Sequence, residues 1–383
     1  MVKEITFGLI GGLGLFLYGM KIMGEGMQKA AGDRMRRILE VLTGNVFLAI
    51  LVGSLVTAII QSSSATTVMV VGFVNAGLMT LQQAIGVIMG ANIGTTITAW
   101  LIAINLSEWA LPAIGIGFLI TMVSRNKTFR YIGQTILGFG LLFLGISTMG
   151  SAMSVLKTSP KIANLFLSFS NSPIEALLIG IAVTMIIQSS SATTGLLIAL
   201  GSQGLISFDA AIPIILGANI GTCITAILAS IGTSRNARKA AMAHLLFNVV
   251  GSLAAMLVLP WFIKLVHTIS VTQDFGHLVA NAHTAFNLAN TLLWVGFVPV
   301  MEKAVNVLVP GKDTLPQKAP AYLDKRMLNT PSVALSLATK ELIRMAHIAH
   351  EMVEDAEVGF FERNRKRIED TFAKEDVVDH IQR

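Results

Sequence analysis

Two polar motifs each occur twice in this 383-residue chain, at the same interval. The sequence QSSSATT occupies residues 61–67 and 188–194, and GANIGT occupies residues 90–95 and 217–222, an offset of 127 residues in both cases. Since the two motifs keep their mutual spacing within otherwise apolar sequence, we infer that an ancestral unit was duplicated. The chain is therefore expected to fold as two similar halves.

The composition is that of an integral membrane protein. Apolar residues make up 53% of the chain and charged residues only 13%, with a mean hydropathy of +0.70. Ordinary soluble domains carry about twice that share of charge. The long stretches without charge contain all four motif copies. The single cysteine, Cys223, excludes an intramolecular disulfide, and we interpret it as a small packing residue.

The spacing of apolar and polar residues predicts an all-α polytopic membrane protein. Segments 7–27 and 133–153 resemble each other, and each can cross a hydrocarbon core of about 30 Å. Segments 46–79 and 173–206 carry QSSSATT near their centres. They are too long for one span and too short for two, so we predict that each is a re-entrant helical hairpin.

A broken transmembrane helix is expected after each hairpin. Residues 81–106 and 208–231 have spanning length, but the GANIGT sequence within each is unfavourable for a helix interior. Three further apolar segments complete the predicted spans: residues 109–123, 240–262 and 280–300.

The basic residues predict opposite orientations for the two halves. Three clusters should be cytoplasmic by the positive-inside rule: Arg34, Arg36 and Arg37; Arg125, Lys127 and Arg130; and Arg235, Arg238 and Lys239. In the first half, the loop that corresponds to the third cluster carries Glu108 and no nearby basic residue, which places it outside. The chain is thus expected to contain two inverted-topology repeats, with the N-terminus outside and the C-terminus in the cytoplasm.

Four regions follow from this organisation. The first inverted repeat is predicted at residues 1–126, the second at 127–263, the last transmembrane helix with a cytoplasmic linker at 264–318, and a cytoplasmic helical segment at 319–383. In the last region, residues 333–358 have the apolar periodicity of an amphipathic helix. A basic run follows, which we interpret as a solvated face: Arg363, Arg365, Lys366 and Arg367.

The motif side chains can serve an anion and a cation together. Unpaired hydroxyl and amide groups cost several kcal/mol in an apolar medium, so they must bind something. Hydroxyls donate and accept, and glutamine offers both a carbonyl oxygen and an NH2 group. Backbone N–H groups left unpaired at half-helix N-termini also favour an anion.

A cation would balance the charge of a bound oxyanion. The four motif copies contain no Lys, Arg, Asp, Glu or His, so a co-bound monovalent cation would have to supply the counter-charge that they lack. Such reciprocal coupling of two ligands would yield symport. Sodium suits an oxygen-only ligand set, whereas proton coupling is less natural because nothing in the motifs titrates.

The paired motifs resemble those of the type II sodium-dependent phosphate cotransporters, the Na/Pi cotransporter family. The resemblance covers about residues 5–300. It implies sodium-driven uptake of inorganic phosphate by alternating access across the bacterial cytoplasmic (inner) membrane, with sodium as co-substrate, no other cofactor and no nucleic-acid partner. The tail resembles the beginning of a PhoU-like helical domain. Homo-oligomerisation stays open.

The resemblance also implies ligands between the two hairpin tips near the membrane midplane. Phosphate ligands are expected among Ser62, Ser63, Ser64, Ser189, Ser190, Ser191, Asn92 and Asn219. Sodium ligands are expected among Gln61, Thr66, Thr67, Gln188, Thr193, Thr194, Thr95 and Thr222. The division of roles within these sets stays open, and bracing of the hairpins is an alternative for the glutamines and for the threonines within QSSSATT.

A second repeated pattern, AHLLFN at residues 243–248 and AHTAFN at 282–287, places a histidine and an asparagine on one helix face. We predict that His244 with Asn248, and His283 with Asn287, support the ion-binding residues without contacting the ions. The alternative is an interhelical hydrogen bond that only fixes the packing of these two helices.

Two other classes of protein remain as alternatives to a transporter. A phosphate-sensing membrane protein could use the same site with slow turnover, and an anion channel could use it without cation coupling. An enzyme is excluded as an interpretation because neither motif offers a nucleophile with a base, a carboxylate pair or a transition-metal ligand set.

Overall fold

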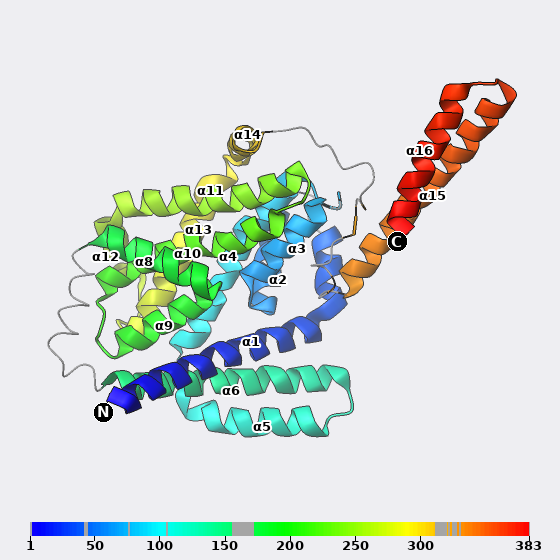
Figure 1. Cartoon of the computed structure of the whole chain (residues 1–383). Helices are drawn as coiled ribbons and strands as arrows, with labels where there is room; N and C mark the ends of the chain where they lie inside the picture. The colour runs from blue at the N-terminus through cyan, green and yellow to red at the C-terminus, as the bar shows by residue number, and fades with distance from the viewer. Residues whose placement is uncertain are drawn as a thin grey trace.

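The computed structural model describes residues 2–41, 45–75, 77–104, 106–154, 172–310, 320, 322–323, 328 and 331–382. Its regular secondary structure is entirely helical (Figure 1). Within these described residues, five helices are long and apolar enough to cross a membrane: Ile5–Ala31 within α1, Leu81–Ala103, Lys127–Ala152 within α6, Phe208–Ser230 and Arg235–Leu257. A bent helix pair would add a sixth span. The prediction of an all-α polytopic membrane protein is confirmed.

In the part of the chain that the structure describes, the first half contains five α-helices and a short 3-10 helix. They are α1 (Val2–Val41), α2 (Val46–Ile60), α3 (Ser63–Asn75), α4 (Leu81–Ala103), η1 (Ser107–Trp109) and α5 (Ala110–Val123). The second half repeats this order with α6 (Lys127–Ser154), α8 (Pro173–Ile187), α9 (Ser190–Ser202), α10 (Phe208–Ser230) and α11 (Arg235–Leu257). Helices α12 (Leu259–Ile269), α13 (Phe275–Val295), α14 (Val298–Leu308), α15 (Pro331–Phe361) and α16 (Arg365–Gln382) follow.

Helices α1 and α6 lie side by side and run in opposite directions (Figure 1). A Cβ atom on Gly12 would lie 2.9 Å from the carbonyl oxygen of Gly145, and one on Gly19 would lie 2.7 Å from that of Gly138. Only glycine allows the two backbones to approach this closely. Gly12, Gly19, Gly138 and Gly145 therefore serve helix packing.

The GANIGT segments do not break their helices. Helix α4 runs through residues 90–95 and α10 through 217–222 without interruption, so the predicted broken helices at 81–106 and 208–231 are wrong. The glycines instead allow backbone contact with the preceding helix. A Cβ on Gly90 would lie 2.0 Å from the carbonyl oxygen of Ile50, and one on Gly217 would lie 2.0 Å from that of Leu177. Tight packing of α4 on α2 and of α10 on α8 overrides the low helix propensity of glycine.

The helices are interrupted at other places. Within each QSSSATT motif one helix ends and the next begins, at residues 61–62 and 188–189.

The predicted span at 280–300 is also wrong at its end, because α13 stops at Val295 and α14 departs at an angle of 86°. Gly296 follows α13 and Pro299 lies in the first turn of α14, where proline is favoured. The predicted span at 240–262 is interrupted between α11 and α12, which likewise has a proline in its first turn.

The C-terminal segment is a pair of packed helices that extends from the core (Figure 1). Helix α15 contains the predicted amphipathic segment 333–358, and its residues Val333 and Leu337 are buried. Part of the basic run is engaged, because Arg367 of α16 donates a hydrogen bond to Asp355 of α15. The predicted linker residues 311–319 and the side chains of Arg34, Arg36 and Arg37 lie outside the described part of the chain.

Asp355 is expected to hold α15 and α16 together. Its buried carboxylate accepts hydrogen bonds from Lys374 (2.8 Å) and Arg367, and these donors hold the pKa of Asp355 below its usual value. Because the folded state favours the charged form, the stabilisation is present above the usual pKa and is lost as the pH falls through the lowered one. In the full chain, replacing Asp355 by Asn should speed amide hydrogen exchange in residues 365–382. Replacement of the exposed Glu354 by Gln should not, and equal exchange in both variants would contradict this role.

Candidate ion-binding site

The two QSSSATT motifs adopt the same local conformation. Gln61 and Gln188 both have φ of 58°, in the left-handed region, and each backbone N–H bonds the carbonyl oxygen four residues earlier at 2.7 Å. This conformation ends the first helix of each pair. The next residue caps the start of the second helix. The hydroxyl of Ser62 accepts a hydrogen bond from the N–H of Ala65 (3.1 Å), and the hydroxyl of Ser189 accepts one from the N–H of Ala192 (3.2 Å).

Threonine pairs hold the two helices of each motif together. The hydroxyl groups of Thr57 and Thr66 are 3.0 Å apart and those of Thr184 and Thr193 are 2.7 Å apart, and all four side chains are buried. Thr66 and Thr193 also bond the carbonyl oxygens of the N-cap serines. This geometry corresponds to the bracing alternative for these two threonines. Thr57 and Thr184, which lie outside the motifs, were missed by the sequence analysis.

A single cavity of about 480 Å³ is lined by both motifs. From the first motif come Gln61 and Ser62, and from the second come Ser189 and Ser191. Gln61 is held in place because its side-chain oxygen accepts a hydrogen bond from Thr98 of α4 (2.9 Å), which also lines the cavity. The structure thus brings together, in one cavity, polar side chains that are more than 120 residues apart in the sequence.

Helix α1 contributes charge to this cavity. Lys21, Glu25 and Gln28 are among its lining residues. The predicted ligands were chosen from the motifs and did not include these three residues. A signal was available, because an ionisable residue within a membrane-spanning segment is a functional candidate by default. Lys21 and Glu25 lie inside the span at residues 5–31.

The other predicted ligands do not line this cavity. Ser63, Ser190, Thr67 and Thr194 are buried within the first turns of α3 and α9, Ser64 is half-buried, and Gln188 is exposed. The four residues predicted from GANIGT are buried along α4 and α10. Asn92 and Thr222 donate side-chain hydrogen bonds to carbonyl oxygens of their own helices. Thr95 and Asn219 are also less than 5% exposed.

The AHLLFN and AHTAFN patterns form part of a buried polar seam between α10, α11 and α13. His283 lies 3.1 Å from the side-chain oxygen of Asn219 in the second GANIGT, and Asn248 contacts the sulfur of Cys223. The seam contains side-chain atoms without a hydrogen-bond partner among the described residues, namely both ring nitrogens of His244, Nδ1 of His283 and the oxygens of Asn248, Asn287 and Asn290. Ordered water or an ion normally satisfies such atoms.

Replacing His244 by Gln should lower the amount of folded protein or the transport rate, because the seam would lose part of its hydrogen-bonding capacity. Sodium affinity should stay nearly unchanged, since His244 does not line the cavity shared by the two motifs. Sodium titration of phosphate uptake would measure this, with replacement of the exposed His350 by Gln as control. A large loss of sodium affinity would contradict the supporting role.

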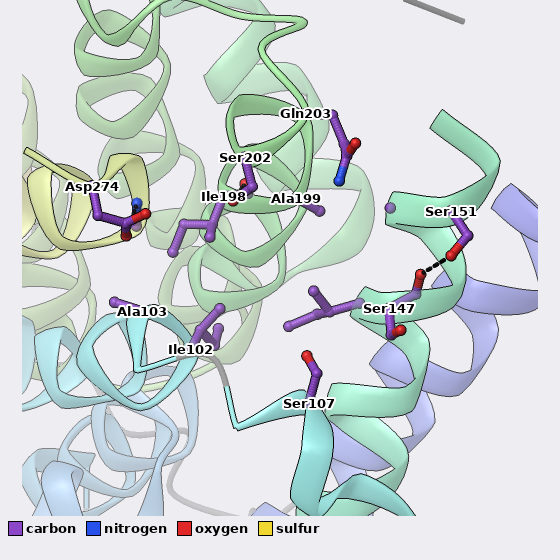
Figure 2. A pocket seen from close by; sticks show the side chains of 13 residues that line it. Ile102, Ala103, Ser107, Ser147, Ser151, Ile198, Ala199, Ser202, Gln203 and Asp274 are labelled. Atoms are coloured by element: carbon purple, nitrogen blue, oxygen red, sulfur yellow. Dashed lines mark hydrogen bonds between the residues drawn. The ribbon is translucent and has the colours of Figure 1, made fainter. Parts of the chain in front are cut away.

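A second cavity of about 480 Å³ lies at the C-terminal end of α9. Figure 2 shows that Ser202 at the end of α9, the following residue Gln203, Ser107 of η1 and Asp274, which caps α13, surround it. Ser147 and Ser151 of α6 complete its polar lining. In the alignment of α6 with α1, these two serines correspond to Lys21 and Glu25. Equivalent faces of α1 and α6 therefore line two different cavities, and only that of α1 carries charges.

Comparison with known proteins gives consistent matches over most of the chain. The family model described as Na+/Pi-cotransporter matches residues 15–151 and 153–281. The uncharacterized protein YqeW of Bacillus subtilis is 32% identical over 301 residues, which are 78% of this chain and 96% of that protein. The "Putative inorganic phosphate export protein YjbB" of Escherichia coli is 30% identical over 351 residues, 90% of this chain but 64% of that protein.

A more distant match is the human sodium-dependent phosphate transport protein 2B, 34% identical over 139 residues, which are 34% of this chain and 20% of that protein. No solved structure gives a significant match. The chain therefore spans nearly all of YqeW but less than two thirds of YjbB.

Proposed function

Because the chain belongs to the Na+/Pi-cotransporter family, we propose that it is a secondary transporter that couples the movement of inorganic phosphate into the cell to that of sodium. The observation that carries the proposal is the single cavity lined by both QSSSATT motifs. The family membership indicates transport rather than an enzymatic reaction.

The chemistry of the cavity suits an oxyanion with a hard cation. Ser62, Ser189 and Ser191 offer hydroxyl groups that donate hydrogen bonds to phosphate oxygens, while the lone pairs of the same hydroxyl oxygens can coordinate sodium. Residues at the N-terminal ends of α3 and α9 also line the cavity, among them Ala65, and the N-terminus of a helix favours a bound anion. A bound sodium ion lowers the free energy of the bound anion, and a bound anion lowers that of sodium. This reciprocal effect couples the two fluxes.

We propose that the two halves are inverted repeats and that alternating access exchanges their conformations. The contacts between α1 and α6 support this. Gly12 corresponds to Gly138 and Gly19 to Gly145 in the aligned segments, and Gly12 packs on Gly145 while Gly19 packs on Gly138. Such an exchange of partners between antiparallel helices is what a two-fold axis between equivalent elements produces.

The proposed orientation has the N-terminus outside and the C-terminus in the cytoplasm of a bacterial inner membrane. Single cysteines at positions 35 and 236 should then react with an impermeant thiol reagent from the same, cytoplasmic side. Labelling of these two positions from opposite faces would exclude the arrangement.

Export of phosphate is a second candidate direction, which the printed name of YjbB favours. A coupled transporter moves phosphate in the direction set by the combined sodium and phosphate gradients, so both directions use the same site. The direction of flux in cells loaded with labelled phosphate would decide between import and export. Faster efflux from cells that make the protein, under a physiological inward sodium gradient, supports export, and faster accumulation supports import.

Phosphate accumulation in proteoliposomes tests the coupled-transport proposal. With an inward sodium gradient the vesicles should accumulate labelled phosphate above the external concentration, and potassium in place of sodium should abolish this. Sodium-independent flux that only equilibrates phosphate would indicate a channel, and binding without flux would indicate a sensor.

We also propose that α15 and α16 are the first two helices of a PhoU-like cytoplasmic domain. The exposed apolar side chains of Leu335, Leu342, Val353 and Phe360 on α15 support further helix packing there.

A further inference from the structure

We propose that Lys21 and Glu25 of α1 make the shared cavity selective for tetrahedral oxyanions that still carry a proton, so that phosphate and arsenate are accepted and sulfate is rejected. The proposal rests on the proposed phosphate transport and names the basis of substrate choice at that same site.

The placement of the two residues supports a joint role. Positions 21 and 25 are one helical turn apart and therefore lie on one face of α1. Both line the cavity that also contains Ser62, Ser189 and Ser191. Among the described residues that line this cavity, Lys21 and Glu25 are the charged ones. An anion held by the serines thus has an ammonium group and a carboxylate on the wall formed by α1.

Glu25 is positioned by a neighbour on the same helix. Its Oε2 atom lies 3.2 Å from Nζ of Lys29, one turn further along α1. Lys29 is exposed and does not line the cavity. Because a carboxylate has about four acceptor positions, this ion pair leaves acceptor capacity for a donor inside the cavity. The trio Lys21, Glu25 and Lys29 carries a net positive charge, which partly offsets the charge of a bound anion.

The difference between phosphate and sulfate lies in the proton. At neutral pH phosphate retains at least one P–OH group, whereas sulfate has only bare oxygens. Lys21 can donate to bare oxygens of either anion, but Glu25 can only accept. Phosphate satisfies Glu25 with its P–OH group. Sulfate would set its negative oxygens against a carboxylate with no proton between them, and a site built to accept a substrate hydrogen bond rejects strongly the analogue that lacks it.

A pair of charges on a helix surface often has no function beyond solvation, but the corresponding face of α6 makes this interpretation unsatisfactory. Ser147 and Ser151 occupy the equivalent positions and line the second cavity, which lacks both QSSSATT motifs. On these two equivalent helix faces, the charged residues thus line the cavity that contains the motif serines, and the α6 face contributes serines to the other cavity, where Asp274 is a charged lining residue from outside α6.

Competition between phosphate and sulfate in proteoliposomes tests the proposal. In the wild-type protein, unlabelled phosphate and arsenate should inhibit labelled phosphate uptake, and sulfate should inhibit it weakly. Glu25→Gln replaces the acceptor by an amide that can donate to bare oxygens, so the sulfate concentration for half-inhibition should fall about tenfold or more. Glu25→Asp keeps the carboxylate and should keep the rejection of sulfate. Lys21→Gln should raise the KM for phosphate about tenfold or more.

Ser151→Ala serves as the matched control, because it alters the equivalent position in the other cavity and should leave the ratio of phosphate to sulfate inhibition unchanged. If sulfate inhibits wild-type uptake as strongly as phosphate does, this result alone overturns the proposal, before any variant is measured. So would unchanged selectivity in a Glu25→Gln protein that elutes as folded. In both cases sodium-driven phosphate uptake by the wild type would still stand, and its absence would instead refute the proposed function.

Discussion

Replacing Ser191 by Ala is expected to weaken phosphate binding by about 10- to 100-fold, because a hydrogen bond to a charged group contributes roughly 1.5–3 kcal/mol. Ser191 lines the shared cavity and lies in the first turn of α9. Unlike Ser189, whose hydroxyl caps α9, it has no capping role that its removal would disturb. The loss should therefore show in KM for phosphate while the folded yield stays normal.

Ser64 provides the control for this prediction within the same chain. It is the equivalent of Ser191 in the first QSSSATT, also half-buried, but it does not line the cavity. Ser64→Ala should change the KM for phosphate much less than Ser191→Ala. Equal losses in both variants would mean that the two motifs bind phosphate symmetrically, against the arrangement found here.

Adding a methyl group at Gly90 or Gly217 is expected to prevent folding. A Cβ at either position would lie 2.0 Å from a backbone carbonyl oxygen of the packed helix, and a backbone atom cannot move aside as a side chain does. Overpacking of a core commonly costs about 1–3 kcal/mol, and contact with backbone in a helix pair should reach or exceed the upper figure. We expect little or no monodisperse protein after detergent extraction of Gly90→Ala or Gly217→Ala.

Gly115→Ala on α5 is the matched control, because a Cβ there meets nothing within 4 Å. This variant should express and elute like the wild type. Normal yield of Gly90→Ala together with normal transport would show that α2 and α4 are not packed as described.

The sequence predicted the class of fold because hydropathy and motif spacing report directly on membrane insertion and duplication. The left-handed residues Gln61 and Gln188 end one helix within each QSSSATT motif. This agrees with the expectation that the chain turns from one helix to the next there. GANIGT misled because glycine has two opposite uses. It weakens an isolated helix, yet in lipid it allows close helix packing, and sequence alone does not reveal that α2 and α8 lie against these glycines.

The candidate site was predictable only in part, because residue types can be chosen from the sequence but their positions around a cavity cannot. Residues such as Ser62 and Ser189 could be selected because repeated hydroxyl groups in apolar sequence are costly without a ligand. Which of the serines line a cavity depends on helix rotation, and this separates Ser191 from its equivalent Ser64. The contribution of Lys21 could not follow from the motifs, because α1 reaches the cavity through tertiary packing against segments far along the chain.

Protection of introduced cysteines at the two tips tests most directly whether both motifs hold one ligand set. Cysteines would replace Ser62 or Ser189, one at a time, in a protein whose buried Cys223 is changed to Ala, with cysteine at position 64 as the control outside the cavity. We predict that phosphate slows thiol modification at both 62 and 189 only when sodium is present, and leaves position 64 unaffected. Protection at one tip alone, or at neither tip under conditions that support transport, would contradict a shared site.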